Sequence, residues 1–325
     1  MTILPDASAP LTADVAAEAF GLILDGKAAA CDIQQFLTIL SNREETSIEI
    51  AAAVREMRKR MIAIEAPAGT IDVCGTGGDG SHSLNISTAV AIVVAACDVP
   101  VAKHGNRAAS SKSGAADTLE ALGLNLDRAS DTAQATLADL GICFLFAQKH
   151  HPALGALAPI RKAIGKRTIF NLTGPAANPA MVKRQLIGVA RPDFLSVYAG
   201  ALDLLGYDDA MLVAGDEPLD ELSISGTSSI VRLGQTMVRI TPETAGLPRH
   251  PVEDLKGGDA AYNAAALTRL LDGGTGAYRD AVLLNAAAAL MVAGVVNDWH
   301  SGIEEAAEAI DKGLAKTLLR CWMEY

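Results

Sequence analysis

Beyond residue 69 the chain alternates short β-prone runs with helical segments, and this alternation restricts the possible folds more than any other feature. The β-prone runs lie at residues 71–74, 99–102, 142–146, 186–189 and 211–213. Strands that alternate with helices predict βαβ units, whose parallel strands form a sheet covered by helices on both faces. The predicted fold class is therefore α/β, with a mostly parallel central sheet.

The segment before this alternation has a purely helical pattern. Four apolar residues fall at the spacing of one helix face: Ile33, Phe36, Leu37 and Leu40. Thr46 and Glu49 have the spacing of a capping box. The run APAG at residues 66–69 then breaks the pattern. We expect a small helical domain at residues 1–66 and a larger α/β domain at residues 67–325.

The bulk composition argues against several classes of protein. The net charge of −11 argues against nucleic-acid binding, which normally requires a basic surface. The five cysteines are widely spaced and include no Cys-x-x-Cys pair, which predicts reduced thiols. No signal peptide is visible, and the longest apolar stretch, residues 281–296, is too short for a membrane span. We expect a soluble, cytoplasmic protein in which that stretch is a buried helix.

The segment after the first predicted strand has the composition of a phosphate-binding loop. It reads DVCGTGGDG at residues 72–80 and leads through SLNIST at residues 83–88 into a predicted helix. Glycines let the backbone approach an anion closely, and the free amides of a helix N-terminus favour phosphate. The ordinary alternative is a tight turn followed by a helix N-cap.

Two better-known phosphate loops do not match this segment. Gly75, Gly77 and Gly80 satisfy the dinucleotide pattern G-x-G-x-x-G. That fold needs an acid at the end of the second strand, whereas Asp98 precedes its strand. The Walker pattern fails because no Gly-Lys-Ser/Thr follows. The sequence therefore predicts a phosphate cradle of a third kind.

A second donor-rich segment is expected to leave the next strand at its carboxyl end. It reads KHGNRAASSKSG at residues 103–114 and contains three cationic side chains, one His and three serines. Such a loop suits phosphate or carboxylate groups better than it suits a solvated surface turn. Two such loops on adjacent strands predict a substrate with two separated phosphate groups.

Two further positions have open interpretations. Residues 203–221 contain seven acids and no Lys or Arg, and most of these acids are expected to be solvated. The pair Asp220–Glu221 could instead hold Mg²⁺ near a phosphate. Arg161, expected on the same helix as His151, could pair with a substrate carboxylate or lie at the surface. Gly174-Pro175 and Asn178-Pro179 predict an irregular joint that could act as a hinge.

Four segments together resemble the anthranilate phosphoribosyltransferase family. They are residues 74–88 (CGTGGDGSHSLNIST), 103–122 (KHGNRAASSKSGAADTLEAL), 151–179 and 219–222 (LDEL). Residues 255–259 (LKGGD) also resemble the late loop of the family, and the order and spacing agree over almost the whole chain. The resemblance implies a helical domain that helices from about residues 151–175 join, a larger α/β domain, and a homodimer formed through the helical parts.

The resemblance also implies an activity and a set of ligands. The enzyme would transfer the 5-phosphoribosyl group of phosphoribosyl pyrophosphate (PRPP) to the amine of anthranilate, releasing pyrophosphate, in tryptophan biosynthesis. The expected PRPP-binding residues are Gly75, Gly78, Asp79, Ser83, Asn85, Ser87, Thr88, Lys103, His104, Gly105, Asn106, Arg107, Ser110 and Ser111. The expected anthranilate-binding residues are Gly75, Asn106 and Arg161, with His104 and Pro175 lining the path. The expected Mg²⁺ ligands are Asp220, Glu221 and Ser87.

The chain departs from the family pattern at a few positions. They are Ser83 in place of a common Thr, Ala115 in place of Ser, Gln148-Lys149 in place of a stretch with Pro, Ala176-Ala177 in place of a bulkier pair, and Tyr262 in place of an acid. None of them removes a metal or phosphate ligand. The smaller pair Ala176-Ala177 is expected to loosen the acceptor channel.

The predicted chemistry needs little acid–base help. Breaking the bond to pyrophosphate leaves positive charge on the ribose and negative charge on the leaving group, which backbone amides, Lys103 and Mg²⁺ can stabilise. The aromatic amine is already neutral, so we expect positioning to dominate, with no covalent intermediate and no general base.

Two rival functions can be compared with this expectation. A pyrimidine nucleoside phosphorylase is similar in fold and in the KHGNR loop, but usually carries an additional C-terminal domain, for which 325 residues leave little room. A non-catalytic, nucleic-acid-binding paralogue should show a basic face and eroded loops, and this chain is acidic with intact loops.

Overall fold

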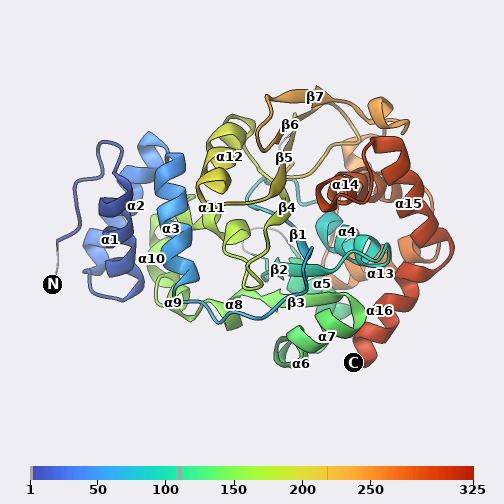
Figure 1. Ribbon diagram of the computed structural model, residues 1–325, viewed down its shortest axis with the longest axis horizontal. Coiled ribbons are helices and arrows are strands. Elements are labelled where there is room, and N and C mark those ends of the chain that lie inside the picture. Colours follow the sequence, from blue (N-terminus) through green and yellow to red (C-terminus); the bar gives the residue numbers. More distant parts are fainter. Residues whose placement is uncertain (1–2, 109–111, 218) are drawn as a thin grey trace.

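The computed structural model describes residues 3–108, 112–217 and 219–325 of the chain. Its first part is helical, with α1 (Ala13–Leu24), α2 (Ala30–Arg43) and α3 (Ser47–Arg58) at one end of the molecule (Figure 1). The capping box is confirmed, because the Thr46 side chain accepts from the Glu49 amide and the Glu49 side chain accepts from the Thr46 amide. The predicted apolar face of α2 is also confirmed, since its four residues are all buried.

The second part contains a seven-stranded sheet with the order β3-β2-β1-β4-β5-β6-β7. The strands are β1 (Ile71–Gly75), β2 (Val101–Gly105), β3 (Ile142–Phe146), β4 (Arg184–Gly188), β5 (Asp209–Gly215), β6 (Ser228–Arg232) and β7 (Val238–Ile240). The first five strands run parallel, and β6 and β7 are antiparallel to their neighbours. The predicted fold class is therefore confirmed. The chain order changes direction between β1 and β4, which is where open α/β sheets bind ligands.

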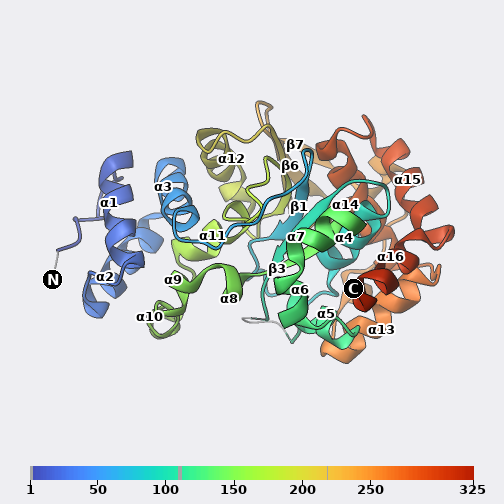
Figure 2. The same ribbon diagram turned by 60° about the horizontal axis from the view of Figure 1, so that its bottom comes forward.

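Helices cover both faces of this sheet (Figures 1 and 2). One apolar cluster joins Ile71 and Val73 of β1 to α4 (Ile86–Ala95), α14 (Ala277–Ala293), α15 (Trp299–Asp311) and α16 (Leu314–Glu324). A second cluster joins Leu212 of β5 to α12 (Leu195–Leu204), α11 (Ile169–Ala176) and the helices α1–α3. The helical part thus packs onto the sheet through α11 and α12.

The remaining helices connect these layers. They are α5 (Ala115–Ala121), α6 (Leu126–Asp131), α7 (Ala133–Leu140), α8 (Ala147–His150), α9 (Pro152–Gly155), α10 (Ala158–Ile164) and α13 (Ala260–Leu271), with the 3-10 turns η1 (Pro192–Phe194), η2 (Pro242–Ala245) and η3 (Val252–Leu255). Among the described helices, none is long and apolar enough to cross a bilayer. The apolar stretch at residues 281–296 lies largely in α14, most of which is buried as predicted.

The strand predictions differ most from the structure in two places. The second strand begins at Val101 and continues to Gly105, so it lies further along the chain than residues 99–102. The antiparallel pair β6 and β7 had no counterpart in the prediction. Two of the three β7 residues are exposed, so this edge strand lacks the buried apolar run that marks the inner strands.

The segment between β3 and β4 differs from the sequence interpretation in two ways. His151 lies between α8 and α9 while Arg161 lies in α10, so they do not share one helix. Gly174 and Pro175 lie inside α11, and the predicted irregular joint is therefore wrong at these two positions. Proline fixes φ near the helical value and removes only one donor, which the end of a short helix tolerates.

Candidate functional site

The glycine-rich loop begins where β1 ends, at the point where the strand order changes direction. Gly77, Gly78 and Gly80 adopt positive φ values of 66°, 78° and 76°. An L-residue with a side chain would be strained at each of these positions. Gly77 and Gly78 are exposed, so their backbone faces solvent rather than packed side chains. The loop can therefore approach an anion with its main chain, as its sequence predicts.

Asp220 lies directly above this strand end. A Cβ on Gly75 would lie 2.1 Å from the Asp220 Oδ2 atom, and a Cβ on Gly188 would lie 1.5 Å from the Asp220 carbonyl oxygen. Gly75 and Gly188 are paired in the register of β1 and β4. The Gly77 amide donates to Asp220 Oδ2 over 2.7 Å. Glycines at both strand ends therefore make the room in which this carboxylate sits.

The carboxyl groups of Asp79, Asp220 and Glu221 and the buried ammonium of Lys103 lie close together. Burial raises the pKa of Asp220 to about 7, and the neighbouring Asp79 carboxylate contributes to that rise. Burial also raises the pKa of Glu221 well above its usual value, Asp220 adds to that rise, and the Lys103 ammonium opposes it. The Asp220 amide lies 3.4 Å from Asp79 Oδ2. Crowded carboxylates of this kind favour a bound cation.

The first turn of α4 presents polar groups to the same place. The Ser87 hydroxyl accepts from Lys103 Nζ over 3.3 Å, and the Ser87 amide donates to Glu221. The Thr88 hydroxyl is buried and has no hydrogen-bond partner among the described residues. An orphaned hydroxyl at a helix N-terminus suits an anionic ligand.

Asn85 is occupied by protein groups. Its Oδ1 atom accepts from the Thr118 hydroxyl and from the Asn263 amide, the latter over 2.8 Å. Its carbonyl oxygen accepts from the Tyr278 hydroxyl over 3.1 Å. The Gly257 amide donates to the His82 carbonyl oxygen over 2.8 Å, so the late loop is bonded to the glycine-rich loop. In this structure the Asn85 side chain therefore joins the start of α4 to α5 and α13.

Lys103 and His104 do not lie in a loop as predicted, because β2 continues through Gly105. Both side chains are buried within the sheet. Lys103 Nζ donates to the Val73 carbonyl oxygen over 2.9 Å as well as to Ser87. The Lys103 ammonium therefore lies inside the sheet, close to the carboxylates, rather than in a solvent-exposed loop.

Arg107 lies near the start of the second loop and forms ion pairs with two acidic side chains. Its guanidinium donates to Asp117 Oδ1 over 2.9 Å and to Glu120 Oε2 over 2.8 Å. The other Asp117 oxygen accepts from the amides of Ala108 and Gly114, each over 2.9 Å. One carboxylate thus bonds to both ends of the loop. The sequence analysis missed Asp117, although its position three residues after Gly114 is a capping-box signal.

The rest of the second loop is only partly described. Asn106 is exposed, and its Oδ1 atom accepts from the Arg107 amide over 2.8 Å and from the Gln148 amide over 3.4 Å. Ser110 and Ser111, which were expected to bind PRPP, lie outside the described residues.

Two of the expected acceptor residues, His104 and Pro175, lie at the junction of β2 and α11. His104 Nδ1 donates to the Gly174 carbonyl oxygen over 3.0 Å, and the ring centroids of His104 and His151 are 5.1 Å apart. Burial lowers the pKa of His104 to about 3 and that of His151 to about 4, so both rings are neutral at physiological pH. The half-buried Arg161 has no ion pair with any described carboxylate, and burial lowers its pKa. Pro175 is buried in α11.

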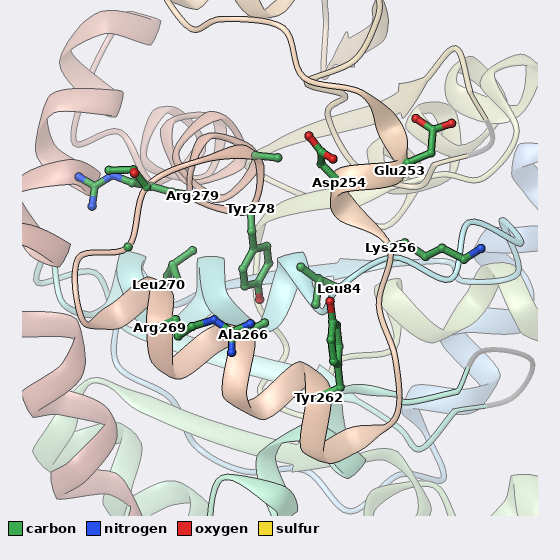
Figure 3. Close-up of a pocket in the computed structure, with 13 residues that line it drawn as sticks. Leu84, Glu253, Asp254, Lys256, Tyr262, Ala266, Arg269, Leu270, Tyr278 and Arg279 are labelled. Carbon is green, nitrogen blue, oxygen red and sulfur yellow. The ribbon is translucent and has the colours of Figure 1, made fainter.

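The residues that depart from the family pattern have plain structural positions. Ala176 and Ala177 are fully buried in the apolar cluster of the helical part. We had expected this pair to loosen the acceptor channel, but neither side chain is exposed to an open channel in this structure. Tyr262 is 53% exposed on α13. It lines a cavity of about 480 Å³ behind the late loop, into which Tyr278 of α14 also points (Figure 3). None of the expected ligand residues lines this cavity, although the Tyr278 hydroxyl donates to the Asn85 carbonyl oxygen.

The donor set at the carboxylate site fits a hard cation. Asp220, Glu221 and Ser87 supply oxygen ligands, which Mg²⁺ prefers. Within the described part of the chain, no three His, Cys, Asp or Glu side chains are grouped closely enough to hold a metal ion by themselves. A cation here would need further oxygen ligands, such as those of a substrate phosphate.

Two family models match the chain. Residues 7–61 match the helical bundle domain of a glycosyl transferase family, and residues 68–316 match the a/b domain of that family. The second match alone covers more than half of the chain.

Curated relatives and solved structures agree with these matches. The chain is 63% identical to the anthranilate phosphoribosyltransferase of Novosphingobium aromaticivorans, over 99% of each chain. The solved structure of the enzyme of that name from Thermus thermophilus is 39% identical, with a TM-score of 0.94 over 98% of this chain and 96% of that one. The enzyme from Saccharomyces cerevisiae, solved in complex with PRPP and Mg, is 27% identical, with a TM-score of 0.89 over 97% and 93%.

Proposed function

The chain belongs to the anthranilate phosphoribosyltransferase family, and from this premise we propose that it transfers the 5-phosphoribosyl group of PRPP to the amine of anthranilate. Pyrophosphate is the second product, and the reaction is a step of tryptophan biosynthesis. The observation that carries the proposal is the position of Asp220 directly over Gly75, where the glycine-rich loop and the N-terminus of α4 meet. This arrangement combines a cation site with a phosphate site.

We assign PRPP to the two loops at the ends of β1 and β2. The exposed backbone of Gly78 and the first turn of α4 supply donors for phosphate oxygens, while the Gly77 amide donates to Asp220. The Lys103 ammonium, which is bonded to the β1 backbone, supplies positive charge from the side of the sheet. The proposed PRPP-binding residues remain Gly75, Gly78, Asp79, Ser83, Asn85, Ser87, Thr88, Lys103, His104, Gly105, Asn106, Arg107, Ser110 and Ser111.

We assign Mg²⁺ to Asp220 and Glu221, with Ser87 as a further ligand. The bound ion would neutralise charge on the pyrophosphate oxygens as the bond to the ribose breaks. The raised pKa values of both carboxyl groups support this assignment, because carboxylates that repel each other are stabilised by a cation.

We assign the acceptor to the junction of β2 and α11. The guanidinium of Arg161, which pairs with no carboxylate in the described part of the chain, binds the anthranilate carboxylate, and Gly75 and Asn106 complete the contacts. His104 and Pro175 line the path. The amine of anthranilate is neutral and attacks the ribose carbon while the bond to pyrophosphate breaks, and its proton then leaves to solvent. Positioning and charge stabilisation supply the catalysis, and no residue is needed as a general base.

Anthranilate fluorescence tests this proposal directly. Purified protein is mixed with anthranilate, PRPP and Mg²⁺, and parallel samples contain EDTA or the double variant Asp220→Asn, Glu221→Gln. We expect rapid loss of anthranilate fluorescence that is absent from both controls. Binding of PRPP without any loss would show that the acceptor is wrong, and pyrimidine nucleosides with phosphate would then be tested.

We also propose the assembly, the domain boundary and the location of the enzyme. We propose a homodimer formed through the helical part, where Val15 of α1 and Ile48 of α3 are 39% and 43% exposed. Light scattering at micromolar concentration would test that dimer.

We place the boundary between residues 66 and 67, with α9–α11 in the helical domain, because Leu157 and Phe170 share its apolar cluster. All five cysteines are free, which agrees with the reducing cytoplasm.

A further inference from the structure

Asp72 is a fully buried carboxylate that the proposed reaction does not use. It lies in β1 and receives hydrogen bonds from three amide groups. Its Oδ1 atom accepts from the His104 backbone amide over 3.1 Å. Its Oδ2 atom accepts from Asn178 Nδ2 and from Gln185 Nε2, each over 2.9 Å. These three contacts come from β2, from the segment after α11, and from β4.

The charge of Asp72 is balanced within the sheet. Burial raises the pKa of Asp72, and the buried Lys103 ammonium lowers it. All three amide partners donate, so the site is built for a carboxylate that accepts hydrogen bonds. A buried charge without such partners would be strongly destabilising. The Lys103 ammonium and the three donors therefore partly offset the burial that raises the pKa of Asp72.

The same donors extend the network to α11. Gln185 Nε2 also donates to the Pro175 carbonyl oxygen over 2.9 Å. Asn178 Nδ2 also donates to the Ala102 carbonyl oxygen over 2.8 Å. Asp72 is thus bonded directly to the backbone of His104 and, through Gln185, to that of Pro175. These are the two residues that line the proposed acceptor path.

We infer that Asp72 is a positioning residue for the acceptor half of the site. It holds the main chain of β2 at His104 and the end of α11 at Pro175 in a fixed relation. The inference rests on the proposed function, because it assigns Asp72 a role in binding anthranilate. Asp72 touches neither substrate, and it acts only through the segments that it orders.

A carboxylate of this kind could instead serve stability alone, and Glu49 provides a matched comparison. Glu49 is also fully buried, in the helical part, and accepts from the amides of Leu11 and Thr46 over 2.8 and 2.9 Å. It also pairs with Arg43. Loss of either carboxylate removes a buried, charge-assisted set of hydrogen bonds, but only Asp72 is connected to the acceptor path.

The test compares Asp72→Asn, Glu49→Gln and the double variant Asp72→Asn, Gln185→Glu. In the single Asp72 variant, one of the two acceptor oxygens becomes an amide nitrogen, which cannot accept from the donors that face it. In the double variant, the carboxylate introduced at position 185 accepts a hydrogen bond from the amide introduced at position 72. For each purified protein we would measure Tm, kcat and the KM for both substrates, following anthranilate fluorescence.

We expect both single variants to lose stability, while Asp72→Asn alone raises the anthranilate KM by about tenfold, more than the PRPP KM. The double variant restores a hydrogen bond between positions 72 and 185 but not the link to Pro175, because a carboxylate cannot donate to the Pro175 carbonyl oxygen. We therefore expect its anthranilate KM to stay raised. An unchanged anthranilate KM in Asp72→Asn, or an equal rise in Glu49→Gln, would overturn the inference. If Asp72→Asn does not fold, Gln185→Leu takes its place, because it removes the hydrogen bond to the Pro175 carbonyl oxygen. This variant must raise the anthranilate KM. Turnover by the wild-type enzyme tests the proposed function separately, so the two failures are distinguishable.

Discussion

The carboxylate of Asp220 occupies the space that a side chain on Gly75 would need. A Cβ on Gly75 would lie 2.1 Å from Asp220 Oδ2 and 2.7 Å from its Cγ. The two residues belong to segments far apart in the sequence, and the close approach places the acid over the glycine-rich loop. The absence of a side chain at Gly75 is therefore a condition for the proposed metal site.

Replacing Gly75 by alanine should impair catalysis more than folding. The new methyl group displaces the Asp220 carboxylate, so we expect the PRPP KM to rise by at least about tenfold. Gly155→Ala is the matched control, since a Cβ there meets no atom within 4 Å. Steady-state kinetics and Tm of both variants provide the measurement. Equal PRPP KM values in the two variants would contradict the steric account.

Replacing Asp220 by asparagine should stabilise the metal-free protein at pH 8. The folded protein holds the pKa of Asp220 at about 7, above its usual 3.8, so the stabilising contribution of the neutral acid is complete below about pH 4 and is lost as pH rises through 7. Asparagine stays neutral at pH 8 and avoids this loss. We expect a Tm in EDTA about 1–2 °C above that of the wild type.

The same variant should lose its response to the ion. Thermal melts with Mg²⁺ and pyrophosphate should raise the Tm of the wild type and leave that of Asp220→Asn unchanged. A metal-free variant that melts below the wild type would show that Asp220 stabilises the fold without a cation.

Replacing Asp117 by asparagine should loosen the second loop. One Asp117 oxygen bonds to the amides of Ala108 and Gly114, and the other bonds to Arg107. We expect the PRPP KM to rise several-fold, with a smaller change in kcat, because the loop is proposed to bind PRPP. Glu120→Gln is the control. Its pair with Arg107 is exposed, so its loss should change KM by less than about twofold.

The buried histidines should make the protein sensitive to acid. The folded state lowers the pKa of His151 from 6.5 to about 4, so its contribution is complete above about pH 6.5 and is lost as pH falls towards 4. At pH 5 this amounts to about 2 kcal/mol of unfolding free energy. We expect His151→Gln to show a smaller drop in unfolding free energy between pH 7.5 and 5 than the wild type does. Denaturant titrations at the two pH values would measure this, with the exposed His300→Gln as control. Equal drops would contradict the assignment.

Much of the fold was predictable because its signals are local. The capping box at Thr46 depends on residues within one turn, and β3 begins and ends at the residues that its apolar run predicts. Where the local signal is weak, the prediction failed. The edge strand β7 buries only Ile240 and has no apolar run, and Pro175 continues α11 because its fixed φ is also a helical one.

The sequence by itself determined the chemical types in the site. Gly77, Gly78 and Asp79 are adjacent, and a strand followed by glycines and a helix start predicts an anion-binding turn. Asp220 and Glu221 were recognisable as a candidate cation pair, but their spacing alone favoured two solvated charges. Only the resemblance to a family linked that pair to the loop.

The tertiary structure decided which of these groups meet. Strand order brings β1 between β2 and β4, and the register pairs Gly75 with Gly188 so that Asp220 enters above both. The same order buries Asp72 among donors from three segments, a role that a single acid in a strand sequence does not reveal. Such pairings depend on long-range packing of the sheet, which local periodicity does not encode.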